Sequence, residues 1–195
     1  MKIKPSVVVW TVLSAAVVYF FGYLLFPPKH VPEEFSDARS YGAVVAQRIL
    51  ELSKNTSAKL NEILEQDRNY NYSEALLLIS QQLIANRENN QEALKLASQL
   101  ERMTRFSNQI SPSDARQIAT EAVTSEVALV SRLMVYNEYL RQLFDVLKQK
   151  FEQPWVSAGD QVEFLISKIN DEVKAINELN ERFTASMQTF DSMVQ

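Results

Sequence analysis

The amino-acid sequence predicts an all-α protein, in which one N-terminal transmembrane helix precedes an antiparallel four-helix bundle with a coiled-coil-like C-terminal helix. Three observations favour this fold class. No charged residue lies between Lys4 and Lys29, residues 43–111 and 160–195 contain neither Gly nor Pro, and the last of these segments repeats apolar residues in heptads. No segment shows the period-two alternation that is typical of a half-buried strand.

The transmembrane helix is predicted over residues 6–26, which are almost wholly apolar. As a helix this segment is about 31 Å long at about 1.5 Å per residue, and it therefore matches a hydrocarbon core of about 30 Å. Trp10 near one end, and Tyr19 and Tyr23 near the other, are placed to anchor the helix at the two interfaces.

The distribution of positive charge predicts the orientation of this helix. Lys2, Lys4 and the α-amino group precede it, whereas Lys29 is followed by several acidic residues. We therefore expect residues 1–5 to be a cytoplasmic tail and the C-terminal domain to be periplasmic or extracellular. Two alternatives stay open, a buried core helix and a signal peptide cleaved near residues 14–16. Cleavage there would leave an apolar N-terminus, so an uncleaved anchor is preferred.

A proline-rich connector is expected over residues 27–35, because Pro27, Pro28 and Pro32 stop the membrane helix. The exported helical bundle is then predicted over residues 36–195. Its helix boundaries follow from capping patterns, with Asn71 and Ser111 as N-caps, Pro112 as the first helical residue, and a break at Pro154. The predicted helices cover residues 36–67, 73–108, 112–152 and 157–194.

The segment 86–92 contains no apolar residue, and Asn89 with Glu92 forms a possible second capping pair. The helix over 73–108 is therefore either continuous or split there, and a split would give a five-helix bundle. The helix over 112–152 has two neighbouring apolar stripes, which is typical of a central helix. The first stripe contains Ala119, Ala122, Leu129, Leu133, Tyr136 and Leu140, and the second contains Val123, Val127, Val130 and Met134.

The last helix has the clearest periodicity, with heptad a and d positions occupied without a gap from Val162 to Val194. Asn180 is the one polar residue among these positions, and a lone Asn at an a position sets register and partner number in coiled coils. The other interpretation is an Asn at the edge of the bundle. The sequence predicts binding to a second copy or to a helical partner through this helix, with the following candidate residues: Ile166, Ile169, Val173, Ile176, Asn180, Phe183, Met187 and Phe190.

Composition excludes several classes of function. The chain has no Cys, one His and three isolated Gly residues, so it offers no thiolate or multi-histidine metal site and no glycine-rich phosphate loop. The net charge is −4 and no basic patch is present, which disfavours nucleic acid as a partner. We expect no catalytic residue, no cofactor and no metal ion.

The sequence also contains one candidate for a buried acid and one candidate set of residues for a ligand pocket. Glu126 interrupts an apolar stripe and is either a buried acid or an acid that reaches water at the stripe edge. Phe106, Tyr136 and Tyr139 are candidates to line a ligand pocket between helices. The leading functional hypothesis is a single-pass, non-enzymatic scaffold or assembly subunit at the cell envelope, and the alternative is a membrane-anchored ligand-sensing domain.

Overall fold

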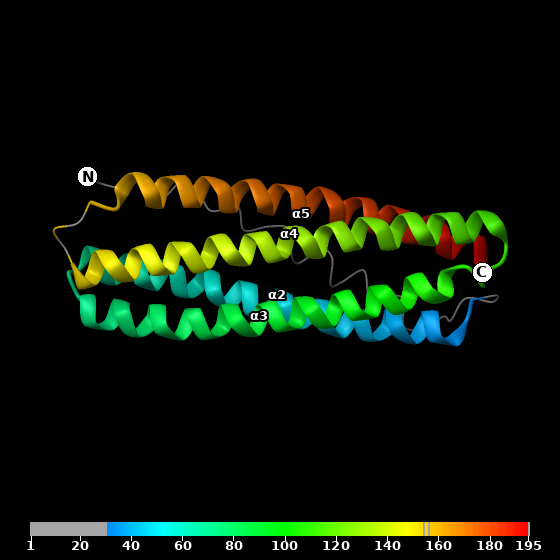
Figure 1. The fold of residues 1–195 in the computed structure, drawn as a ribbon, viewed down its shortest axis with the longest axis horizontal. Coiled ribbons are helices and arrows are strands. Elements are labelled where there is room, and N and C mark those ends of the chain that lie inside the picture. The colour runs from blue at the N-terminus through cyan, green and yellow to red at the C-terminus, as the bar shows by residue number, and fades with distance from the viewer. Residues whose placement is uncertain (1–30, 154, 156, 195) are drawn as a thin grey trace.

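The computed structural model describes residues 31–153, 155 and 157–194, which form four helices and contain no strand. The helices are α2 (Glu33–Arg68), α3 (Tyr72–Ser107), α4 (Ser113–Glu152) and α5 (Gly159–Val194). Consecutive helices run antiparallel along one long axis (Figure 1). The prediction of an all-helical fold with four long helices is therefore confirmed for the residues that the structure describes.

The predicted membrane helix lies outside the described residues, as do its anchor residues Trp10, Tyr19 and Tyr23. Among the helices over residues 31–194 that the structure describes, none is both long and apolar enough to cross a membrane.

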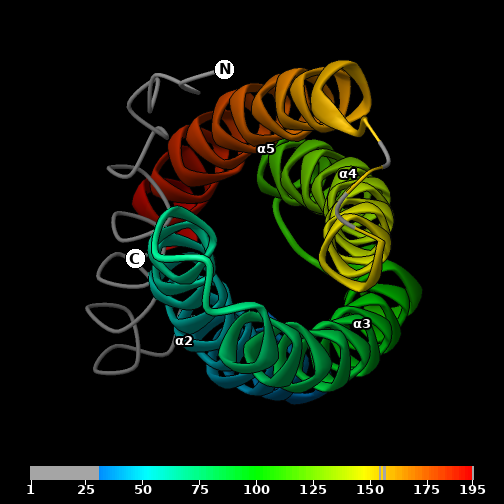
Figure 2. The same ribbon diagram turned by 90° about the vertical axis from the view of Figure 1, so that its left-hand side faces the viewer.

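The four helices do not contact one another equally. α2 packs along α3, α3 along α4, and α4 along α5. Figure 2 shows that α5 begins beside α4 and runs obliquely, so that its C-terminal end lies toward α2. There Arg39 donates two hydrogen bonds to the Asp191 carboxylate, at 2.8 and 2.9 Å, and the rings of Phe35 and Phe190 lie 5.9 Å apart. We call the line along which α2 faces α5 the α2/α5 seam; it is closed at this end by these two contacts.

α3 is one continuous helix, so the five-helix alternative is wrong. Its polar segment does not break the helix, because Asn86 and Asn89 are buried against α4. The Nδ2 of Asn86 donates to the main-chain oxygen of Asn137 at 2.8 Å, and the Nδ2 of Asn89 donates to the Oδ1 of Asn137 at 3.1 Å. Asn137 in turn donates to the Oδ1 of Asn90 at 3.0 Å. We call Asn86, Asn89, Asn137 and the neighbouring Ser53 and Gln82 the central polar layer.

The helix ends agree with the predicted ranges to within a few residues, but the predicted capping interactions do not form. Asn71 is the N-cap of α3, yet its side-chain amide donates to the Oε1 of Gln66 instead of capping the helix. Pro112 is the N-cap of α4, not its first helical residue. α2 begins at Glu33, inside the segment expected to be a connector, with Pro32 as its N-cap and the fully buried Phe35 in its first turn.

The two predicted stripes of α4 differ in the structure. Most of the first stripe is buried, as predicted. In the second stripe Val123 and Val130 are buried, whereas Val127 and Met134 are 46% and 42% exposed. α4 packs against both α3 and α5, as expected of a central helix, but its second stripe also borders an open groove between α3 and α4.

Asn137 is the hub of the central polar layer, so its replacement by Leu should destabilise the fold by about 2 kcal/mol, because the buried amide of Asn89 loses an acceptor. Chemical denaturation measures this loss, with Asn61→Leu on the exposed face of α2 as the control. In the double variant with Asn89→Leu the loss should be smaller than the sum of the single losses. Additive losses would contradict a direct contact between the two amides.

Candidate interaction site

The apolar face of α5 is largely buried within the chain's own bundle. Ile169, Ile176, Phe183, Met187 and Phe190 belong to the core. Glu172 lies on the α4 side of this face, where Arg132 donates to its Oε1 at 3.4 Å. Five of the eight candidate interaction residues therefore pack against the chain's own helices, which is the ordinary consequence of a heptad that closes an internal bundle.

The other three candidates, Ile166, Val173 and Asn180, lie on the side of α5 that faces the α2/α5 seam. Spacings of seven and eleven residues return to nearly the same helix face, so these residues share a face with Asp191. Asp191 is paired with Arg39 of α2, which fixes the direction of that face. All three side chains are half-buried, Ile166 and Val173 pack in part against the core, and Asn180 makes no hydrogen bond with the described residues. We call Ile166, Val173 and Asn180 the seam row.

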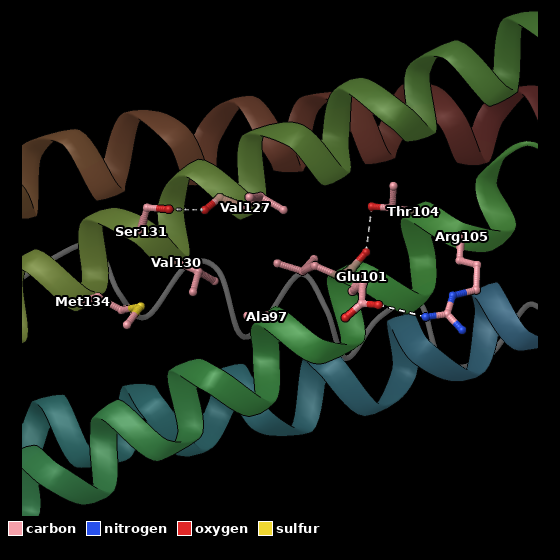
Figure 3. Close-up of a pocket in the computed structure, with 9 residues that line it drawn as sticks. Ala97, Glu101, Thr104, Arg105, Val127, Val130, Ser131 and Met134 are labelled. Carbon is pink, nitrogen blue, oxygen red and sulfur yellow. Dashed lines mark hydrogen bonds and ion pairs between the residues drawn. The ribbon is translucent and has the colours of Figure 1, made fainter.

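A second apolar surface lies between α3 and α4. Figure 3 shows this groove, with a volume of about 520 Å³, between Ala97, Glu101, Thr104 and Arg105 of α3 and Val127, Val130, Ser131 and Met134 of α4. A smaller hollow of about 140 Å³ continues it toward Ser107 and Thr120, along the same pair of helices.

The polar groups of the α3/α4 groove are already hydrogen-bonded within their own helices. The hydroxyl of Thr104 donates to the main-chain oxygen of Leu100 at 2.8 Å, and that of Ser131 donates to Val127 at 3.0 Å. Arg105 donates to Glu101 at 2.8 Å on the rim (Figure 3). Because these donors are engaged, the groove suits an apolar occupant.

The aromatic candidates for a pocket are not brought together. Tyr136 is buried next to Asn137, and burial raises its pKa to about 12. Phe106 lies near the end of α3, about 24 Å along the helix from Asn90, which meets Asn137. Tyr139 is half-buried, and none of the three lines either hollow between α3 and α4. Phe106 is therefore too far along the bundle from Tyr136 and Tyr139 for all three to line one pocket.

Glu126 is a buried acid, so the interpretation in which it reaches water is wrong. Its Oε2 accepts no hydrogen bond from the described residues, and burial raises its pKa to about 7. By contrast, hydrogen bonds donated by Arg141 and Gln142 lower the pKa of the exposed Glu138 to about 2. Within the described residues no three His, Asp or Glu side chains are grouped so as to hold a metal ion.

Sequence reasoning missed the central polar layer and the α3/α4 groove. The sequence signal for the layer was the apolar-free segment 86–92, which has the composition of a loop. The groove gave no signal, since Val127 and Met134 follow the same spacing as covered residues.

Comparison of the chain with protein-family models, with curated proteins and with solved structures found no match in any of the three.

The buried carboxyl of Glu126 should make the stability of the fold depend on pH. Its folded pKa of about 7 lies above the ordinary value of 4.5, so the folded state resists ionisation. The contribution of Glu126 to stability should be fully present below pH 4.5, decrease as the pH rises toward 7, and be about 3 kcal/mol smaller above that.

Glu126→Gln should remove this part of the pH dependence and be the more stable protein at pH 8. Denaturant midpoints measured between pH 4 and 8 test this, with the exposed Glu163→Gln as the matched control. Equal pH profiles for the wild type and Glu126→Gln would show that the carboxyl is solvated in the folded protein.

Proposed function

We propose that the chain is a single-pass, membrane-anchored protein whose exported helical bundle acts as a non-enzymatic scaffold or assembly subunit at the cell envelope. It binds through α5, and its partner is a second copy of the chain. The observation that carries this proposal is the half-buried seam row, Ile166, Val173 and Asn180, on a helix whose five other candidate residues are all used in the core.

The geometry of the seam supports an additional helix beside α5. At one end, α2 and α5 are joined by the ion pair of Arg39 with Asp191 and by the ring contact of Phe35 with Phe190. Extensive packing occurs only between helices that are consecutive in the chain, and α2 and α5 are not. Along the rest of α5, the seam row presents two β-branched apolar side chains and one amide. Such a row matches the heptad a position of a parallel two-stranded coiled coil.

The predicted membrane anchor favours a second copy as the partner. Two copies anchored in one membrane with the same orientation have parallel α5 helices, so that equal heptad positions face each other. Asn180 then meets Asn180 of the other copy, and each amide donates to and accepts from its mate. This pairing supplies the hydrogen-bond partners that Asn180 does not find among the described residues.

A ligand-binding domain is the second candidate function, and one observation favours it. The α3/α4 groove of about 520 Å³ has the size of a small-molecule site, and its polar groups are engaged within their own helices. The ligand of such a site would be apolar. It would not contact Tyr136, Tyr139 or Phe106, which do not line the groove.

Val173→Glu tests the proposed interface, because it places a carboxylate opposite its symmetry mate. We expect the association constant of the full chain to fall at least tenfold, which corresponds to about 1.4 kcal/mol. Sedimentation equilibrium in density-matched detergent measures association, and circular dichroism checks that the helices are kept. Val135→Glu, on the exposed side of α4, is the matched control and should leave association unchanged.

Two results would contradict self-association through the seam row. The wild-type chain would sediment as a monomer at every concentration, or Val173→Glu and Val135→Glu would weaken association equally. The first result leaves a different helical protein as the partner of α5. Val127→Glu, in the α3/α4 groove, separates the two surfaces, since it should affect ligand binding but not the dimer.

A further inference from the structure

The central polar layer contains three buried oxygen atoms to which no described residue donates a hydrogen bond. They are the Oε1 of Gln82 and the Oδ1 atoms of Asn86 and Asn89. These side chains are only 2%, 3% and 3% exposed. Their spacing of four and three residues places them on one face of α3, so the three acceptors lie in adjoining turns of the bundle interior.

The orientation of the Asn86 amide follows from its partner. Its Nδ2 lies 2.8 Å from the main-chain oxygen of Asn137, and a carbonyl oxygen only accepts hydrogen bonds. The nitrogen must therefore face α4, and the Oδ1 must point elsewhere. The Nδ2 of Asn89 is likewise turned toward Asn137 and Ser53, at 3.1 and 3.4 Å. The Nδ2 groups of Asn86 and Asn89 therefore donate to residues of α4 and α2, whereas their Oδ1 atoms accept no hydrogen bond from the described residues.

A buried acceptor without a donor costs on the order of 1–3 kcal/mol, so three in one layer would be a large penalty for a fold of ordinary stability. The missing donor must be a small group that donates and fits among short side chains. Water satisfies both conditions, since buried waters commonly bridge buried polar groups that are otherwise unsatisfied.

We propose that the central polar layer is an internal water-binding site, in which at least two water molecules donate hydrogen bonds to Asn86, Asn89 and Gln82. The three ligating atoms are uncharged amide oxygens, which compensate a dehydrated cation poorly because they carry no opposite charge. The site therefore takes a neutral donor. Bound water completes the hydrogen bonding of the residues that join α2, α3 and α4.

A crystal structure of the full chain, grown in a rubidium salt, tests the site directly. We expect an electron-density peak without anomalous signal, within hydrogen-bond distance of the Oδ1 atoms of Asn86 and Asn89. An anomalous peak at that position would overturn the proposal in favour of a monovalent cation, and a layer without any peak would overturn it in favour of a dry core.

A stability measurement tests the proposal independently. If the layer is dry, Gln82→Met removes an unsatisfied acceptor and should raise the melting temperature. If water is bound there, Gln82→Met removes one of its partners, and the melting temperature should stay the same or fall. Gln81→Met, on the exposed face of the same helix turn, is the matched control. A melting temperature raised for Gln82→Met but not for Gln81→Met would overturn the proposal.

Discussion

The requirement that a buried amide be hydrogen-bonded fixes the register of the two central helices. Asn137 is fully buried on α4 and meets Asn86, Asn89 and Asn90 of α3 through both its side chain and its main-chain oxygen. A shift of α3 along α4 by one turn would separate these groups and leave several of them unsatisfied in the core. Apolar side chains alone tolerate such shifts more easily, since their contacts are not directional.

The same register sets the two different surfaces along the α3/α4 pair. On one side of the central polar layer, toward the end of α3, apolar residues of α4 border the α3/α4 groove. On the other side, Arg141 pairs with Glu138 and Asp145 on the surface of α4. The surface of α4 is therefore charged on the Arg141 side of the central polar layer. On the other side of the layer, where α4 borders the α3/α4 groove, its exposed side chains are apolar.

The ends of the bundle differ in the way they are closed. Near the start of α2, the bidentate pair of Arg39 and Asp191 is almost wholly buried and lies beside the rings of Phe35 and Phe190. At the opposite end, Lys150 of α4 bonds Asp67 of α2 at 2.6 Å, and the ring of Tyr72 stacks on Phe151. Among the described residues, α5 has no equivalent hydrogen bond or ring contact with α2 at that end, and the two helices are not an extensively packed pair.

The sequence by itself determined the helical class, the number of long helices and most of the core, because proline and glycine positions and apolar periodicity are local properties. It did not reveal the turn after α2, where Tyr70 adopts a positive φ of 57° without a glycine or asparagine at that position. The tertiary structure alone decided whether a polar or apolar side chain is covered. Asn86 and Asn89 look like loop residues yet are buried, and Val127 and Met134 look like core residues yet are exposed. Glu126 is enclosed with no charged partner among the described residues. The physical reason is that burial depends on which helix lies opposite, and that is set by the register and crossing of helices far apart in the chain.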